Sequence, residues 1–483
     1  MSDLRRRLRV VVDREPLPWQ REVLSALARV ADLDVEAAAS RTPVRRSAAV
    51  ALYARLDRWR DGRHAPIDSG THLPAYEAVV DLAGGGAVAE CPVLFAEPSA
   101  LDEDRLVARL ARGERTLRLE VRLRRPDGAV VVAAASTIGL VRLSARRSTE
   151  RIAPRIAALF TRAVQRLHEE GTFEPAAETS PSTSASSVDA ARILARAGVA
   201  AARVAVTRVD WRVAYGRVSS PDPFALPATF ESLASPVGHF YADPFVVTGD
   251  EGTFVFVEDF DVAAGRAGIA VVDVATGQAT TVLAPPYHLS YPFVFEAEGA
   301  WWMVPESAAA SEVVLHRCTR FPAEWERHEV LLAGLEAYDA TLLQRDGRWW
   351  LFFASGTPGA PDDELHVWFA DSLQGPYEPH PLNPVVSSVV GARPAGRLVV
   401  AGDRLLRPGQ DGSREYGGAI VVHEMDELTP TRYREHPVAR IDGRAVGAPG
   451  THTYNRAGDV VVVDTKHRVA QRSLRSGFSA RYR

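Results

Sequence analysis

The stretch ADPFVVTGDEGTFVFVE (242–258) joins one apolar strand to a second through a turn that contains Gly252. The same plan recurs four more times along the chain. The related stretches are SYPFVFEAEGAWWMVPE (290–306), YDATLLQRDGRWWLFFAS (338–355), ARPAGRLVVAGDRLLRP (392–408) and THTYNRAGDVVVVD (451–464). A β-hairpin unit repeated every ~40–50 residues is typical of a propeller with one blade per repeat. Five such units predict an all-β five-bladed β-propeller.

Polar residues stand at matching positions in these repeats. The innermost strand of each propeller blade runs beside the central channel, so equivalent positions are expected to form a ring. The leading positions are Asp243, Tyr291, Asp339, Arg393 and His452, spaced by 48, 48, 54 and 59 residues. The second strands should return to the same mouth of the channel, where they finish at Glu258, Glu306, Ser355, Arg407 and Asp464. Two polar rings at one mouth predict a site, although a single aspartate before a strand also fits a turn or capping role.

The bulk composition limits the classes of function. The chain has 483 residues and a formal net charge of −4, which argues against general binding to nucleic acid. No stretch approaches the ~20 apolar residues of a transmembrane helix. Cys91 and Cys318 are the two cysteines, and they form neither a disulfide framework nor a metal-ligand spacing. These features predict a protein of the cytoplasm with no cofactor and no metal ligands.

The region before the repeats has a different texture. Apolar runs at 8–13, 33–39 and 75–84 read as strands, and 150–168 reads as an amphipathic closing helix. This alternation predicts a Rossmann-like α/β domain over 1–170. The glycine-rich LAGGGAVAE (82–90) lacks the G-x-G-x-x-G pattern, so dinucleotide binding is not expected. We expect a Ser/Pro-rich linker with a short helix over 171–200, and the propeller over 201–475.

The residue types of the ring indicate carbohydrate chemistry. Neighbouring buried carboxyl groups raise each other's pKa, and such a pair can supply the acid and the base that glycosidic bond cleavage requires. Arginines favour phosphate or carboxylate groups, so the expected ligand is a small molecule or glycan with an anionic group. The residues expected to bind it are Glu258, His288, Tyr291, Arg393, Arg407, Gln410, Asp411 and His452. A lone histidine such as His452 is interpreted as a packed residue rather than a metal ligand.

Several stretches occur in the order found in a known domain family. FYADPFVV, YHLSYPFVF with WWMVPES, LHVWFADSLQGPYEPHPLNPV, EYGGAIVV and GTHTYN resemble the domain N-terminal to the catalytic module of plant glucosamine inositolphosphorylceramide transferases. The resemblance covers about 205–470. That family is more distantly similar to the five-bladed glycosidases of families 43, 32 and 68. The analogy implies that Asp243 is the base or nucleophile and that Asp339 tunes the acid. Glu306 is the best acid, although the glycosidases place theirs after the second aspartate, where this chain has Arg393.

The first domain is similar in layout to a formyltransferase-like domain. LRVVVDREPLPWQREVL (8–24) and LYARLDRWRDG (52–62) carry this likeness. Formyl transfer in that fold uses an Asn–His–Asp set, and the asparagines here are Asn383 and Asn455, both outside the domain. We therefore expect an inactive domain that shapes the site, binds a partner or supports a homodimer.

Two other functions stay open at this point. One is a non-catalytic module that binds a sugar or sugar nucleotide and assists a separate glycosyltransferase. The other is a tailoring lyase or transferase that uses the same pocket on an acidic substrate.

Overall fold

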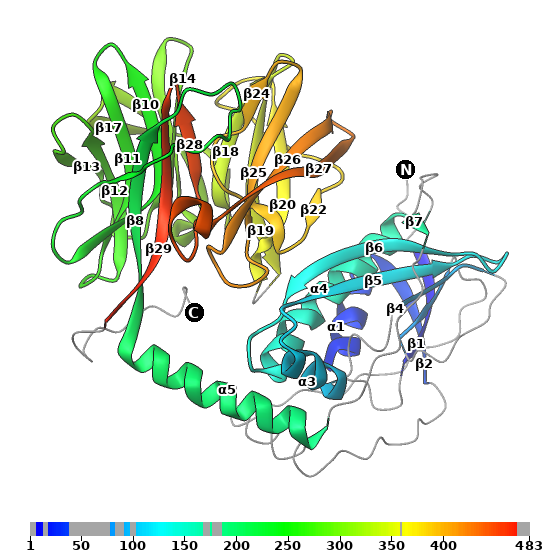
Figure 1. Ribbon diagram of the computed structural model, residues 1–483. Coiled ribbons are helices and arrows are strands. Elements are labelled where there is room, and N and C mark those ends of the chain that lie inside the picture. The colour runs from blue at the N-terminus through cyan, green and yellow to red at the C-terminus, as the bar shows by residue number, and fades with distance from the viewer. Residues whose placement is uncertain are drawn as a thin grey trace. The chain divides into compact units, whose positions relative to one another are not determined.

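The computed structural model describes residues 6–12, 18–37, 78–82, 91–96, 103–167, 174–175, 186–357 and 360–470. The chain divides into two compact units, the first Met1–Ala202 with Thr357–Ala360 and the second Arg203–Gly356 with Pro361–Arg483. The first unit is an α/β domain and the second is a five-bladed propeller (Figure 1). The fold class expected from the sequence is confirmed for both.

The first unit is built on one mixed sheet in the order β2-β1-β3-β4-β5-β6-β7. Its first four strands are parallel, and the other three continue the sheet antiparallel. The strands are β1 (Arg6–Val12), β2 (Ala31–Ala37), β3 (Ala78–Asp81), β4 (Val93–Ala96), β5 (Thr116–Arg124), β6 (Val130–Gly139) and β7 (Glu174–Pro175). The first three confirm the strands expected near 8–13, 33–39 and 75–84.

Helices complete the core of this unit. They are α1 (Pro18–Leu27), α3 (Glu103–Arg112), α4 (Ala145–Gln165) and α5 (Ser187–Val206). The closing helix α4 buries Ile152, Ile156 and Phe160 against the sheet, as its apolar spacing predicts. The α5 helix has 20 residues and is longer than the short helix expected there. Residues 52–62, the glycines of 83–90 and the Ser/Pro-rich stretch 176–185 lie outside the described residues.

The second unit consists of five sheets that correspond to the five repeats. Blade 1 contains β10 (His239–Gly249), β11 (Gly252–Asp261), β12 (Arg266–Asp273) and β13 (Ala279–Leu283). Blade 2 contains β14 (Ser290–Ala297), β15 (Ala300–Glu306), β16 (Glu312–Arg320) and β17 (Glu324–Ala333). Blade 3 contains β18 (Tyr338–Arg345), β19 (Arg348–Thr357), β20 (Ala360–Ala370), β21 (Glu378–Pro379) and β22 (Val386–Ser387). Blade 4 contains β23 (Val390–Pro394), β24 (Val399–Ala401), β25 (Arg404–Asp411), β26 (Ala419–Leu428) and β27 (Tyr433–Asp442).

Blade 5 closes the propeller with strands from both ends of the unit. Its sheet has the order β28-β29-β8-β9, with β28 (Tyr454–Ala457) and β29 (Val460–Ala470) paired to β8 (Thr207–Arg217) and β9 (Glu231–Ser232). The inner strands contact one another in turn: β28 with β10, β10 with β14, β14 with β18, and β18 with β23. Closure of the ring therefore rests on β29 pairing with β8, which the repeats alone did not indicate.

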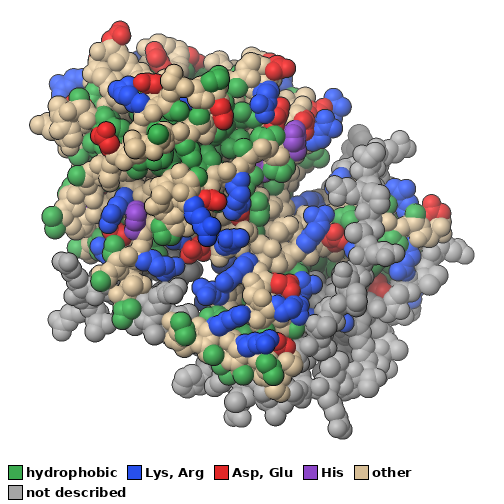
Figure 2. Space-filling model, viewed as in Figure 1, with side chains coloured by type: hydrophobic (Ala, Val, Ile, Leu, Met, Phe, Trp, Pro, Cys, Tyr) green, Lys and Arg blue, Asp and Glu red, His purple; other side chains and the backbone are tan. Residues whose placement is uncertain are grey.

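Aromatic and aliphatic side chains fill the space between adjacent blades. Phe245, Phe293 and Met303 belong to one core that joins blades 1 to 3, while Leu406 and Val463 belong to another that joins blades 4 and 5. No helix among the described residues is long and apolar enough to cross a membrane. On the face in view, acidic and basic side chains are interspersed over the propeller (Figure 2), in keeping with the small net charge.

Candidate functional site

A β-bulge in each of three inner strands directs the leading side chain of the repeat. The pairing register shifts between Ala242 and Phe245 in blade 1, and blades 2 and 3 shift at the same place. The bulged residues Asp243, Tyr291 and Asp339 have φ angles of 47°, 44° and 55°. This left-handed conformation is unusual for a residue with a side chain, and bulges near functional sites commonly re-aim one. All three side chains reach across to neighbouring blades.

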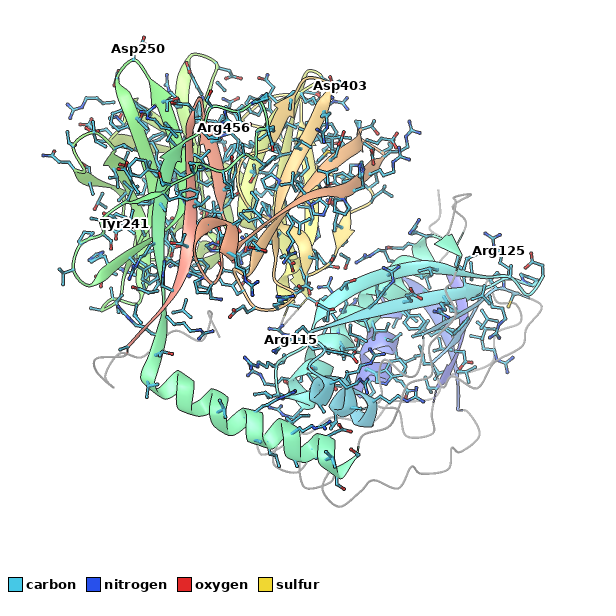
Figure 3. The ribbon with its side chains drawn as sticks, in the orientation of Figure 1. Arg115, Arg125, Tyr241, Asp250, Asp403 and Arg456 are labelled. Atoms are coloured by element: carbon cyan, nitrogen blue, oxygen red, sulfur yellow. The ribbon has the colours of Figure 1, made fainter. Side chains whose placement is uncertain are left out.

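The ring lies toward the end of the propeller opposite to the inner hairpin turns. Asp250 and Asp403 mark the turns after β10 and β24, while Tyr241, two residues before Asp243, lies toward the other end (Figure 3). At that end Glu258 pairs with Ala242 and Glu306 pairs with Ser290, so the two glutamates hold equivalent places in adjacent blades.

Arg393 connects two of the carboxylates. Its guanidinium donates two hydrogen bonds to Asp339, of 2.6 and 3.1 Å, and one of 3.5 Å to Glu306. Gln410 donates a further hydrogen bond of 2.7 Å to Asp339. Arg393 also lies 5.4 Å from the ring centres of Tyr338 and Tyr416, so its cation is held by charge and by two aromatic faces.

His452 connects the other carboxylates. Its Nδ1 is paired with Asp464, and its Nε2 lies 3.6 Å from Oδ1 of Asp243. The imidazole stacks on Trp211 with a centroid distance of 4.1 Å. Burial opposes the charged form of His452, but Asp464 and Asp243 outweigh it and raise the pKa of His452. Thr453 completes this group by donating a hydrogen bond of 2.7 Å to Asp243.

The buried carboxyl groups differ in acidity. Burial raises the pKa of Asp243 to about 6, against the opposing charge of His452. Burial also raises the pKa of Glu306 to about 8, with Asp339 adding to the rise and Arg393 opposing it. For Glu258, burial and the neighbouring carboxylates raise the pKa well above its ordinary value. At neutral pH Asp243 is therefore mainly ionised, and Glu306 is mainly protonated.

Glu258 and His288 lie next to each other in the site. Glu258 is 4 % exposed, and Nε2 of His288 lies 3.6 Å from its Oε1. That oxygen accepts no hydrogen bond within the part of the chain that the structure describes. On its other side the imidazole accepts a hydrogen bond of 3.1 Å from the backbone N–H of Ala267.

Tyr291 is a buried residue that contacts neighbouring blades. Its hydroxyl accepts a hydrogen bond of 2.8 Å from the backbone N–H of Gly396 and lies 3.0 Å from Oγ1 of Thr341. Burial raises its pKa, with Asp339 adding to the rise. The next residue, Arg397, donates a hydrogen bond of 2.7 Å to the carbonyl of Val294. These contacts tie blades 2, 3 and 4 together.

Two predicted ligand-binding residues have other partners. Arg407 lies four residues short of the end of β25, where Asp411 pairs with Val390. The expectation that this strand finishes at Arg407 is therefore wrong in register, because β24 lengthens the connection between β23 and β25. Arg407 is buried and donates hydrogen bonds of 2.8 and 2.6 Å to Glu435.

Asp411 stands at the end of β25 and is also paired. It forms an ion pair with Arg440 and accepts a hydrogen bond of 2.8 Å from the backbone N–H of Ser413. Burial acts against ionisation, but these contacts prevail and lower the pKa of Asp411.

One group of described residues approaches the geometry of a metal site. The ligand atoms of Asp243, His452 and Asp464 lie within 4.8 Å of one another. Both ring nitrogens of His452 face carboxylates, and Asp464 accepts backbone hydrogen bonds from His452 and Thr453 at 2.8 and 3.1 Å. We interpret the group as an ion-paired triad, in which His452 lies between the two aspartates.

The structure thus brings together nine of the predicted site residues: Asp243, Glu258, His288, Tyr291, Glu306, Asp339, Arg393, Gln410 and His452. Sequence reasoning missed the role of Trp211, because β8 is far from the last repeat in the chain. Asp464 was placed at a strand end but was not chosen as a site residue. The stretch THTYNRAGDVVVVD held the available signal, since a hairpin brings Asp464 back to His452, from which it is separated by 12 positions in the sequence.

Comparison with known proteins finds a family similar to the propeller. Residues 218–454 match the family model described as glucosamine inositolphosphorylceramide transferase 1, N-terminal. The glucosamine inositolphosphorylceramide transferase 1 of Oryza sativa subsp. japonica is 37% identical over 209 residues, which are 41% of this chain and 28% of that protein. The Arabidopsis thaliana protein of the same name is 30% identical over 238 residues, or 47% of this chain and 31% of that protein.

The chain therefore spans less than a third of the length of these curated relatives. Among solved structures, a family 117 glycoside hydrolase from Zobellia galactanivorans is similar over 48% of this chain and 76% of its own, with 12% identity and a TM-score of 0.35. A family 43 β-1,3-galactosidase is similar over 42% and 47%, with 11% identity and a TM-score of 0.33.

Proposed function

We propose that the propeller binds the sugar part of a glycoconjugate beside the buried carboxyl groups of the candidate site. In this proposal the propeller acts on the sugar by acid and base chemistry. The observation that carries this proposal is the pair Asp243 and Glu306. Both are buried, and burial raises their pKa values to about 6 and about 8. Two carboxyl groups whose pKa values differ in this way supply one base and one acid near neutral pH.

The neighbours of the pair have supporting roles in this proposal. Asp243 is the base, and Thr453 and His452 hold it in its ionised form. Glu306 is the acid, and Asp339 keeps it protonated because an adjacent negative charge disfavours a second one. Arg393 joins Asp339 to Glu306 and sets the distance between them.

The anionic group that the sequence predicts for the ligand is not expected to bind at Arg393 or Arg407. Arg393 is occupied by Asp339, and Arg407 by Glu435. An anionic group in the ring would have to replace one of these carboxylates. We therefore place the anionic part of the glycoconjugate outside the ring, with the sugar inside.

A second candidate function is a sugar-binding module that assists a separate glycosyltransferase. The observation that favours it is the partial match to the curated relatives. Only 28% to 31% of those transferases corresponds to this chain. In this alternative the same ring selects a sugar, and bond cleavage or transfer occurs elsewhere.

Binding and turnover measurements on the parent protein and two variants distinguish the two functions. A thermal-shift screen of sugars, sugar phosphates and sugar nucleotides supplies the ligand, and release or transfer of the sugar measures turnover. If the ring is catalytic, Glu306→Gln loses about 10²- to 10⁴-fold in rate while binding is largely kept. Asp403→Asn, at an exposed turn on the other end, is the matched control. Weakened binding without any turnover in the parent protein would favour the binding module.

A further inference from the structure

Arg397 reaches across the central channel of the propeller. It belongs to blade 4, between β23 and β24, yet its guanidinium lies 6.0 Å from the ring centre of Phe245 in blade 1 and 5.3 Å from that of Phe293 in blade 2. Its Nη2 donates the hydrogen bond to the carbonyl of Val294, which is also in blade 2. Because blades 1 and 2 do not adjoin blade 4 in a ring of five, the side chain spans the channel.

The guanidinium of Arg397 lies on the other side of the leading residues from the mouth of the candidate site. Arg393 leads the repeat in blade 4, and Arg397 follows it by four positions. The inner strands run from the leading residues toward the hairpin turns, one of which Asp403 marks (Figure 3). Arg397 is therefore nearer to the turns than the carboxyl groups proposed to act on a sugar.

The charge of Arg397 has no carboxylate partner among the described residues. The side chain is half-buried, and burial lowers its pKa to about 10, with Tyr291 acting in the opposite direction. Its Nε and Nη1 make no hydrogen bond with the part of the chain that the structure describes. Two guanidinium nitrogens thus remain able to donate to a group from outside the chain.

The two buried arginines of the same blade differ from Arg397 in this respect. Burial also opposes the charged form of Arg393, but Asp339 outweighs it and raises the pKa of Arg393. Glu435 has the same effect on Arg407. A desolvated cation costs free energy unless an opposite charge accompanies it. The counter-charge that the chain supplies to Arg393 and Arg407 is therefore expected to come from solution at Arg397.

We propose that Arg397 binds a halide ion such as chloride in the propeller channel, on the side of the leading residues that faces the turns. One halide balances the single charge of the guanidinium and accepts hydrogen bonds from its free nitrogens. A doubly charged phosphate or sulfate would leave excess negative charge there and would cost more to desolvate. The bound ion stabilises the bridge that Arg397 makes from blade 4 to blade 2. This site shares no side chain with the proposed sugar site.

Bromide locates the site directly, because it replaces chloride and scatters X-rays anomalously. Crystals of the full chain soaked in sodium bromide should show an anomalous peak beside Nε or Nη1 of Arg397. Anomalous peaks confined to arginines on the outer surface would overturn the proposal. This measurement uses the parent protein alone, so it remains decisive if a variant at Arg397 fails to fold.

The line width of the ³⁵Cl NMR signal measures chloride binding in solution. We expect the excess line width caused by the full chain to fall about threefold or more in Arg397→Met, because the charge-assisted contact is lost. Arg456→Met is the matched control. Arg456 also lies toward the turns (Figure 3), but its three guanidinium nitrogens already donate to the carbonyls of Ser220, Asp222 and Gly458. This variant should keep the excess line width within about a fifth of the parent value.

Thermal unfolding tests the choice of anion. At equal ionic strength, sodium chloride should raise the melting temperature of the parent protein above its value in sodium gluconate, because an ion that binds the folded state stabilises it. The difference should disappear in Arg397→Met and persist in Arg456→Met. Equal line widths for the parent protein and Arg397→Met would overturn the halide site. Sulfate that stabilises the parent protein more than chloride, with the gain lost in Arg397→Met, would overturn the assignment to a monovalent ion.

Discussion

Arg393 and Asp339 form a buried bidentate ion pair that joins blade 4 to blade 3, with hydrogen bonds of 2.6 and 3.1 Å. Asp339 is fully buried, and the guanidinium is its only cationic contact among the residues that the structure describes. Charges in such a place depend on each other, because neither can be hydrated when the other is removed.

Replacing Arg393 with Met should therefore destabilise the propeller strongly. We expect a loss of about 3–5 kcal/mol in the free energy of unfolding, the usual cost of leaving one partner of a buried pair without the other. Urea denaturation at pH 7 measures it. Arg404→Met is the control, because Arg404 pairs with Glu424 at the surface and its loss should leave the midpoint almost unchanged. Equal effects of the two substitutions would show that the buried pair of Arg393 and Asp339 contributes no more to stability than the surface pair of Arg404 and Glu424.

Glu306→Gln should make the protein more stable in alkaline solution. Burial raises the pKa of Glu306 from 4.5 to about 8, so the folded protein keeps a proton that the unfolded chain releases in this window. Stability of the parent protein therefore falls as pH rises from about 4.5 to 8, whereas the variant has no proton to lose. The gain above pH 8 should be on the order of a few kcal/mol and should vanish below pH 4.5. Thermal unfolding across this pH range tests it.

Glu435→Gln should change the stability in the opposite direction, because the pKa of Glu435 is lowered in the folded protein. Burial opposes ionisation of Glu435, but Arg407 prevails and lowers its pKa. This carboxylate stabilises the fold above its unfolded pKa, and the contribution is lost as pH falls through the folded value. The variant should therefore be less stable than the parent at pH 7, with a difference that shrinks in acid. A pH-independent difference for both glutamates would contradict the assigned charge states.

Asp464→Asn should lower the pKa of His452. Burial disfavours the imidazolium, and Asp464 makes the largest of the three carboxylate contributions that outweigh it, ahead of Asp243 and Asp339. NMR titration of the imidazole C–H signals measures the change, with His452→Gln used to assign the resonance. In the parent protein His452 should titrate above 6.5, and in the variant below the parent value. An unchanged titration would mean that the other carboxylates, Asp243 and Asp339, sustain the charge without Asp464.

Gly396→Ala should disrupt the interior of the channel. Gly396 has a φ of 133°, and a Cβ there would collide with the carbonyl oxygen of Tyr454. Strain and overpacking together should cost at least about 2–3 kcal/mol. Gly402 also has a positive φ, of 65°, but open space surrounds it, so Gly402→Ala should cost about 1 kcal/mol. Chemical denaturation of both variants compares the two costs. Similar costs would show that the contact with Tyr454 relaxes freely.

The five blades and most of the ring could be predicted from the sequence because the hairpin repeat is local. Each inner hairpin carries its own alternation and turn, so Asp243, Tyr291 and Asp339 could be matched from one repeat to the next. Arg407 shows where that matching failed. The extra strand β24 displaces the end of β25 by four residues, and the repeat pattern holds no mark of the insertion.

The sequence by itself determined the number of blades, the α/β domain before them and the residues that lead each repeat. The tertiary structure alone decided which of these residues meet. Pairing of β29 with β8 brings Trp211 against His452 across more than 200 residues of chain, and blade packing brings Arg393 to Asp339. Those contacts also set the charge states, because a carboxyl group's pKa depends on the burial and the neighbouring charges that only the closed ring provides.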